Sequence, residues 1–182
     1  MYGLINNVLQ SMIRDKFGDE QWDKVLEASG VTDDSFLSTR SYDDAITYDL
    51  AGAAAEVLGA PLEACLEMFG EYWVQEIAMK SYGPLMDASG ENRVDFLANI
   101  NTLHDRITST FINYTPPEFQ VELLGEARYW VHYISQRRAL VAFVVGLLKG
   151  LALRFDSEPE IHDQQELDVD NGTHTIFEIS VR

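Results

Sequence analysis

The hydrophobic periodicity of the chain changes at the proline pair Pro116–Pro117, and this change constrains the fold more than any other feature. Before the prolines, apolar residues recur at helical spacing. After them, apolar and polar residues alternate in short segments, as in half-buried strands. We therefore predict an α+β fold, in which a helical N-terminal part is followed by an antiparallel sheet with one inserted helix.

Five helices are expected before the prolines, and several of their ends carry capping residues. Asp43 or Ser41 fits the N-cap of the third helix, and Pro61 fits the first turn of the fourth. A loop that contains Gly83 and Pro84 is expected to separate the last two helices. The expected helices cover residues 2–16, 19–29, about 43–58, 62–80 and about 93–112.

Strands and one apolar helix are expected after the prolines. Alternation predicts strands around residues 119–123 and 129–133, and the dipeptide Asn171–Gly172 is a strong signal for a terminal hairpin. The helix is expected over about residues 138–153. Its Gly146 and Gly150 lie four residues apart and would let a neighbouring element approach closely.

Length and charge limit the possible functions. The chain has 182 residues, which suits one domain over 1–182, and its net charge of −17 argues against nucleic-acid and membrane partners. The single cysteine, Cys65, excludes an internal disulfide and fits a packed core position. No leader pattern is evident, and the longest apolar stretch reaches only about half of the ~20 residues that span a bilayer. We therefore expect a cytoplasmic protein.

His104 is the first candidate functional residue. Leu97, Ile100, Ile107 and Phe111 lie on the same face of its predicted helix, so the imidazole is expected to be buried. A buried imidazole needs partners for its nitrogens. The position alone favours a core histidine that is hydrogen-bonded to a neighbour, and it leaves a ligand of iron or zinc as the alternative.

Tyr133, Ser135 and Arg137 form a second candidate. Their spacing of two would place all three side chains on one face of a strand. A guanidinium fork beside two hydroxyl groups is suited to an anion such as a carboxylate pair. Without further context, a solvated strand end is the more common meaning of such a pattern.

The remaining polar residues suggest no catalytic site. His162, Asp163, Asp168, Asp170 and His174 do not have a recognised metal-ligand spacing, and a solvated acidic hairpin is favoured there. His132 is expected on the strand face opposite to Tyr133 and is interpreted as structural. Phosphate-binding loops, dinucleotide glycine patterns and zinc motifs are absent from the sequence.

Taken together, these features resemble the H-NOX (haem nitric oxide/oxygen-binding) family. The resemblance covers nearly the whole chain and rests on motifs in the family's order and spacing. They are Met1–Gln10, Phe69–Val74, Leu103–Arg106, Pro116–Pro117 and the Tyr133–x–Ser135–x–Arg137 pattern. The resemblance implies the H-NOX fold and a bound haem b. It also implies the stand-alone bacterial type, which acts on a separate partner protein.

The resemblance also assigns roles to individual residues. His104 is similar to the axial ligand of the haem iron, and Tyr133, Ser135 and Arg137 are similar to the clamp on the haem propionates. Pro117 resembles the proline that distorts the macrocycle, and Met1 lies near a propionate in related proteins. The remaining cofactor contacts that it implies are apolar or aromatic: Ile5, Trp73, Ile77, Phe143 and Leu147.

The implied function is a non-enzymatic sensor of nitric oxide and carbon monoxide. A histidine kinase or a cyclic-di-GMP enzyme is the implied partner. Oxygen-binding relatives place a tyrosine on the helix after the clamp, whereas residues 139–144 here cannot donate a hydrogen bond. Trp73 and, to a lesser degree, its neighbour Tyr72 could donate; on a helix the two point about 100° apart, so at most one can face the iron, and we interpret Trp73 as packing. The alternatives are an oxygen-binding or oxygen-reactive haem protein, such as a dioxygenase or peroxidase, and an interaction module without metal.

Overall fold

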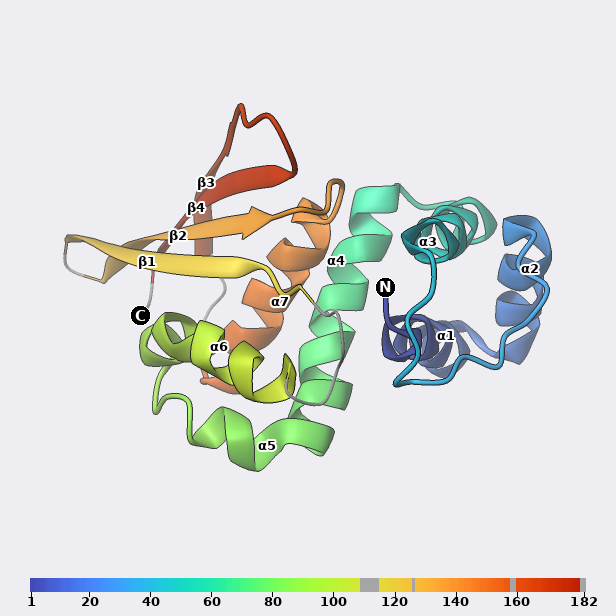
Figure 1. The fold of residues 1–182 in the computed structure, drawn as a ribbon, viewed down its shortest axis with the longest axis horizontal. Coiled ribbons are helices and arrows are strands. Elements are labelled where there is room, and N and C mark those ends of the chain that lie inside the picture. The colour runs from blue at the N-terminus through green and yellow to red at the C-terminus, as the bar shows by residue number, and fades with distance from the viewer. Residues whose placement is uncertain (109–114, 126, 158–159, 181–182) are drawn as a thin grey trace.

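The computed structural model describes residues 1–108, 115–125, 127–157 and 160–180. Three helices form an N-terminal unit on the right of Figure 1: α1 (Gly3–Phe17), α2 (Asp19–Ser29) and α3 (Asp44–Leu58). As predicted, Asp43 caps α3, because its carboxylate accepts a hydrogen bond from the Ala45 backbone N–H at 3.0 Å. The apolar faces of the three helices enclose a core around Met12, Trp22 and Leu50.

The next helical stretch is longer and less regular than predicted. It consists of α4 (Leu62–Tyr72), the π-helical segment η1 (Trp73–Ala78) and α5 (Met79–Asp87) without a break. Pro61 lies at the N-cap of α4, one residue before the predicted first turn. The predicted loop at Gly83 and Pro84 is wrong, since both residues lie inside α5. The helix continues past the proline, since the Ala88 N–H bonds to the Pro84 carbonyl, and the burial of Met86, two residues after the proline, offsets the cost of the donor that Pro84 lacks.

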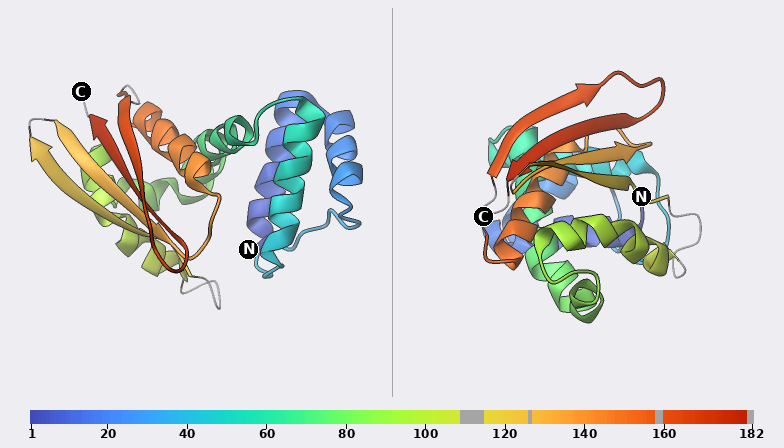
Figure 2. Two further views of the ribbon diagram at one scale, coloured as in Figure 1. Left: turned by 90° about the horizontal axis from the view of Figure 1, so that it is seen from above. Right: turned by 90° about the vertical axis from the view of Figure 1, so that its left-hand side faces the viewer.

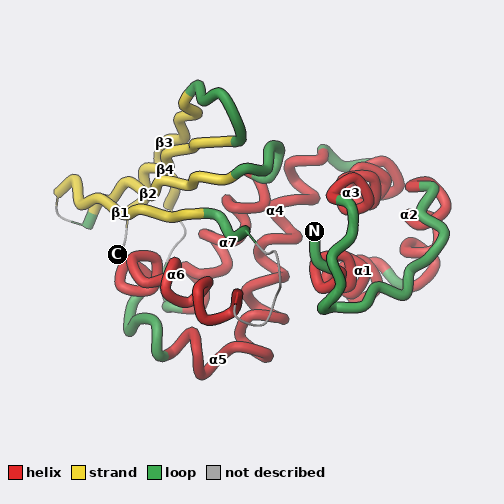
Figure 3. Tube along the Cα trace, viewed as in Figure 1, coloured by secondary structure: helices red, strands yellow, loops and turns green. Residues whose placement is uncertain are grey.

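The second half of the molecule is a sheet with helices against one face, which confirms the predicted α+β class (Figures 2 and 3). Helix α6 spans Arg93–Thr108, so the predicted helix end at Ile112 lies outside the described residues. The antiparallel sheet has the order β1-β2-β4-β3. Its strands are β1 (Glu118–Gly125), β2 (Arg128–Ser135), β3 (Glu160–Leu167) and β4 (Thr173–Ser180).

Alternation along the strands separates a buried face of the sheet from an open one. Phe119, Val131 and Phe177 point to the buried face, where they pack against α6 and against α7 (Val141–Arg154). The side chains of Gln120 and Trp130 point to the opposite face and are exposed. The hairpin predicted at Asn171–Gly172 joins β3 to β4, and Gly172 adopts a φ of 91° that favours glycine.

Helix α7 packs closely against α4, as its glycines predict. A Cβ atom at Gly146 would lie 2.0 Å from the Glu67 carbonyl oxygen, and one at Gly70 would lie 2.2 Å from the Phe143 carbonyl oxygen. The two backbones therefore touch where side chains would otherwise hold them apart. None of the helices in the described ranges is both long and apolar enough to cross a bilayer.

Candidate cofactor site

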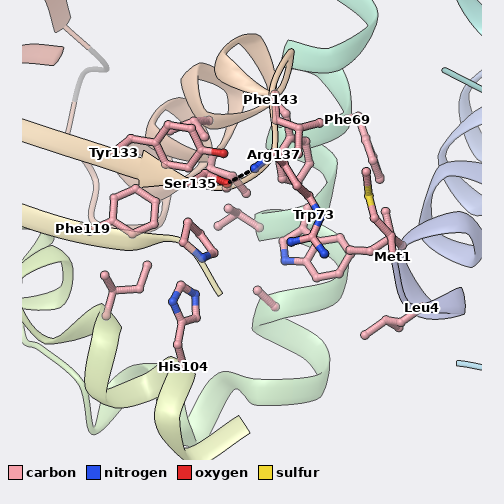
Figure 4. A pocket seen from close by; sticks show the side chains of 18 of the residues that line it. Met1, Leu4, Phe69, Trp73, His104, Phe119, Tyr133, Ser135, Arg137 and Phe143 are labelled. Atoms are coloured by element: carbon pink, nitrogen blue, oxygen red, sulfur yellow. Dashed lines mark hydrogen bonds between the residues drawn. The ribbon is translucent and has the colours of Figure 1, made fainter. Parts of the chain in front are cut away.

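A large apolar cavity lies between the N-terminal unit, the α4–η1 helix, α6, α7 and the buried face of the sheet (Figure 4). Its volume is about 260 Å³. Leu4, Phe69, Leu103 and Phe119 are among the side chains that line it. These apolar side chains offer few partners for water. A cavity of this size and lining therefore indicates a bulky and largely apolar ligand.

His104 reaches the cavity from α6, as Figure 4 shows. Its Nδ1 atom is buried and has no hydrogen-bond partner among the described residues. Burial lowers the pKa of the imidazole, and the Pro117 carbonyl and the Asp105 carboxylate offset this effect only in part. The ring therefore favours its neutral form, whose lone pair can bind a metal ion.

The segment before β1 brings a second group close to His104. Pro117 lines the cavity and Phe119 follows it on β1, with its ring centre 6.2 Å from that of His104. Asn101, one turn before His104 on α6, holds this segment in place. Its side-chain amide exchanges two hydrogen bonds with the Phe119 backbone, at 2.7 and 3.0 Å. The α6–β1 contact therefore fixes Pro117 beside the imidazole.

Tyr133, Ser135 and Arg137, which the sequence analysis grouped by their spacing, lie together at the polar end of the cavity. The predicted strand geometry is wrong for Arg137, because β2 ends at Ser135. The Arg137 backbone N–H bonds to the Ser135 hydroxyl at 3.1 Å, and this turn still directs the guanidinium to the same end of the cavity. Burial raises the pKa of Tyr133, while Ser135 and Arg137 partly offset the rise, so its hydroxyl remains a neutral donor.

Asp44 connects this polar end to the N-terminal unit, and the sequence analysis missed it. Its carboxylate accepts a hydrogen bond from the Met1 ammonium and another from Arg137 Nε, the latter at 2.9 Å. Burial opposes the charge, but these two cations hold the pKa of Asp44 below its ordinary value. The sequence offered only an acidic pair, Asp43–Asp44, whose members prove to have different roles.

Aromatic residues form the cavity wall between α4, η1 and α7. The ring centre of Phe143 lies 4.9 Å from that of Phe69 and 6.4 Å from that of Trp73. The Trp73 indole N–H makes no hydrogen bond to any described residue, and Trp73 lines the cavity. Tyr72 points elsewhere, since its hydroxyl donates to Asp15 on α1. Only one of these two neighbours faces the cavity, as their helical spacing predicts.

The structure brings together ten of the eleven residues that the sequence analysis assigned to the cofactor or its metal. Those ten line the same cavity: Met1, Ile5, Trp73, His104, Pro117, Tyr133, Ser135, Arg137, Phe143 and Leu147. Ile77 is the exception and packs against the N-terminal core instead. In the π-helical segment the hydrogen-bonding interval is five residues, so Ala78 and not Ile77 shares the cavity face with Trp73.

Tyr48 and the remaining histidines complete the description of the candidate residues. Tyr48 of α3 lines the polar end of the cavity and donates to the Arg138 carbonyl at 3.0 Å, a contact that no local pattern signals. The hairpin candidates around His162 form no metal cluster, because the described residues contain no group of three or more suitable ligands. His132 lies on the open face of the sheet, where it pairs with His174.

These groups fit a haem. The unpaired His104 nitrogen could bind iron, the apolar walls suit a macrocycle, and Arg137, the Met1 ammonium and two hydroxyl groups could bind its propionates. The only cysteine, Cys65, is buried and is not among the residues that line the cavity, which leaves no thiol there to bond a macrocycle covalently.

Comparison with known proteins identifies a family. The family model described as Haem-NO-binding matches residues 2–163. Soluble guanylate cyclase gcy-31 of Caenorhabditis elegans is 27% identical over 152 residues, which are 84% of this chain and 22% of that protein. Soluble guanylate cyclase gcy-35 of the same organism is 26% identical over an alignment of 192 positions, which covers 99% of this chain and 27% of that protein. The chain thus spans about a quarter of the length of these relatives.

Solved structures share the fold over its whole length. A variant H-NOX protein from K. algicida, in the unliganded Fe(II) form, has a TM-score of 0.86 at 24% identity, and the match covers 100% of this chain and 97% of that one. An H-NOX protein from S. oneidensis in the Fe(II)NO ligation state has a TM-score of 0.80 at 20% identity, with 100% and 99% covered.

Proposed function

The chain belongs to the haem-NO-binding, or H-NOX, family, and from this premise we propose that it is a haem-based gas sensor with His104 as the axial iron ligand. One observation carries the proposal. The half-buried imidazole of His104, whose buried Nδ1 has no hydrogen-bond partner among the described residues, faces an apolar cavity whose far end gathers an ammonium, a guanidinium and two hydroxyl groups. Few ligands other than a haem need a nitrogen donor, an apolar enclosure and an anion clamp at once.

We infer that the haem is of the b type, held without covalent bonds. The neutral imidazole of His104 is ready to bind iron without first losing a proton. Tyr133, Ser135 and Arg137 would donate to the propionates, and the Met1 ammonium would add a second positive charge. Asp44 already bonds to both cations, so its carboxylate would orient them and compete with the propionates for them.

We infer that nitric oxide and carbon monoxide are the ligands sensed, and that dioxygen is not bound stably. A bound haem would supply an iron, held by His104, to which nitric oxide could bind, and that binding would weaken the bond between the iron and His104. Bound dioxygen gains most from a hydrogen-bond donor, but the cavity-lining residues of α7 and its N-cap are Leu140, Phe143, Val144, Leu147 and Leu151. None of these side chains can donate.

The unpaired indole N–H of Trp73 favours a second candidate, an oxygen-binding or oxygen-reactive haem protein. The aromatic packing of Trp73 against Phe69 and Phe143 supports a packing role instead. A peroxidase would also need a general acid–base pair over the iron, and among the described residues the lining contributes no such pair on this wall.

Signalling would follow from the position of His104. We propose that release of the imidazole lets α6 and Pro117 shift against the N-terminal unit, and that a partner protein responds to this shift. A separate histidine kinase or cyclic-di-GMP enzyme is the partner that the family resemblance suggests. The cavity residues bind and position a ligand, and we assign no catalysis to the chain itself.

Absorption spectra of the purified ferrous protein test this function. The expected result is a haem Soret band that shifts with nitric oxide and with carbon monoxide but not with air. A protein without a haem spectrum after reconstitution would contradict the proposal. A persistent oxygen complex would favour the second candidate, and peroxidase turnover would favour its oxygen-reactive form.

A further inference from the structure

Two histidines meet on the open face of the sheet, away from the haem cavity. His132 on β2 and His174 on β4 are diagonal neighbours, because His132 pairs in register with Ile176 and His174 pairs with Ile134. Tyr133 and Thr175, which follow them in sequence, point to the buried face. The two imidazoles are therefore separated from His104 by the sheet itself.

The distance between the two rings fits shared coordination of one metal ion. His132 Nδ1 and His174 Nε2 share a hydrogen bond at 3.0 Å, with ring planes inclined by 50°, and a metal ion bound to both nitrogens would replace the proton between them. Two imidazole nitrogens bound at ~2.1 Å to one ion lie about 3.0 Å apart when the angle at the metal is a right angle, and about 3.4 Å apart when it is tetrahedral. The observed spacing matches the right angle, which is the preference of Cu²⁺ and Ni²⁺.

A carboxylate lies on the far side of the His132 ring. If Nδ1 binds a metal ion, Nε2 must carry the proton, and a hydrogen-bond acceptor near Nε2 fixes that tautomer. His132 Nε2 is buried without a hydrogen-bond partner among the described residues, and Glu122 Oε1 is 3.6 Å from it. A small rotation of the Glu122 side chain would complete the carboxylate–imidazole pair that metal-binding histidines commonly have.

We propose that His132 and His174 form a second metal site, which binds one Cu²⁺ or Ni²⁺ ion, with Glu122 as the positioning residue. Ile176 and Ile134 pair in register with His132 and His174, and their aliphatic side chains cannot bind a metal ion. Within the described part of the chain, no third acidic, histidine or cysteine ligand joins the pair, and water completes the coordination. The ion would connect β4 to β2, the strand that carries Tyr133 and Ser135.

Titration of untagged, haem-loaded protein with Ni²⁺, followed by calorimetry, tests the site. Ni²⁺ is expected to bind at one site in the wild type. The affinity should fall at least tenfold in His132→Gln and in His174→Gln, and about tenfold in Glu122→Gln. His162→Gln is the matched control, because it removes an exposed histidine from the neighbouring strand β3, and its affinity should equal that of the wild type.

The haem spectrum and circular dichroism of each variant report whether the fold is retained. If one histidine variant does not fold, the Glu122→Gln variant and the other histidine still decide the question. Absence of Ni²⁺ binding by the wild type, equal affinity in His174→Gln, or loss of binding in His162→Gln would overturn the proposal. Normal haem binding with any of these results would leave the sensor function standing, so the two proposals fail separately.

Discussion

The two walls of the cavity are built from different chemistry. The wall of α6 and β1 contributes a histidine with a free nitrogen and a proline fixed beside it by Asn101. The wall of α4, η1 and α7 contributes aromatic and aliphatic side chains and a single N–H group, that of Trp73. This difference suggests a division of roles, in which one wall binds the iron and the other excludes water and selects the gas.

The largest expected effect is at the histidine wall. His104→Gly removes the proposed protein ligand of the iron, so the native haem spectrum should be lost, and added imidazole should restore it. Absorption spectra of the reconstituted variant measure this change. His162→Gly is the control and should behave as the wild type, because that side chain is exposed on β3. A native spectrum in His104→Gly would show that the wall of α6 and β1 does not provide the iron ligand.

Arg137 tests the polar edge that the two walls share. Arg137→Ala removes a charged donor from the proposed propionate clamp. A hydrogen bond to a charged group contributes ~1.5–3 kcal/mol, so the variant should lose haem at least about tenfold more readily. Haem transfer to an acceptor protein measures this loss. Arg138→Ala, which changes the exposed neighbour, should have little effect on haem loss. Equal haem loss from the two variants would show that Arg137 does not bind the propionates.

The helix-built wall can be tested through its packing. A Cβ at Gly146 would lie 2.0 Å from the Glu67 carbonyl oxygen, whereas one at Gly52 of α3 has no neighbour within 4 Å. Gly146→Ala should therefore lower the free energy of unfolding by ~1–3 kcal/mol. Gly52→Ala should raise it by ~0.5–1 kcal/mol. Denaturant unfolding compares the two, and equal midpoints would show that the α4–α7 contact is looser than described.

Asp44 adds a smaller and pH-dependent effect. Its pKa is lower in the folded protein, so its contribution to stability is complete above the ordinary aspartate pKa of 3.8 and is lost as the pH falls through the folded value. The Asp44 side chain is 38% exposed, so the contribution is at most ~1 kcal/mol. Asp44→Asn should be less stable than the wild type at pH 7, and in acid-unfolding curves the gap should narrow as the pH falls below 3.8. A gap that persists at low pH would contradict this assignment.

The smallest expected effect is at Trp73. If its indole is packing and not donating, Trp73→Phe should leave the affinities for nitric oxide and carbon monoxide within about twofold of the wild type. Neither protein should hold oxygen in air. Trp130→Phe, on the open face of the sheet, is the control. An oxygen complex that persists in the wild type and disappears only in Trp73→Phe would reverse the interpretation of this wall.

Most of the fold could be predicted because its helices, strands and turns are marked by residues close together in the sequence. The change of period at Pro116–Pro117, the cap at Asp43 and the four-residue spacing of the α7 glycines can each be recognised from nearby positions in the sequence. Pro84 shows the limit of this approach, since a helix breaker was overridden by packing that includes the buried Met86. The end predicted for α6 lies outside the described residues.

The site residues that belong to a sequence motif could be predicted. Those that act through contacts between residues far apart in the sequence could not. Asp44 holds the Met1 ammonium and Arg137 from positions far away in sequence, and a chain with many acidic residues offers no sign of which one matters. The prediction that Ile77 contacts the cofactor was wrong for a different reason. Ordinary helical spacing places it near Trp73, but the π-helical segment turns Ala78 to the cavity instead.

The iron–histidine stretching band in resonance Raman spectra of the ferrous protein reports the proposed bond between His104 and iron. We expect a band in the unliganded wild type that is lost when nitric oxide binds. We also expect the band to be absent in His104→Gly and to return, at a frequency sensitive to isotopic labelling of the imidazole, when imidazole is added. An unchanged band in His104→Gly would show that His104 is not the iron ligand.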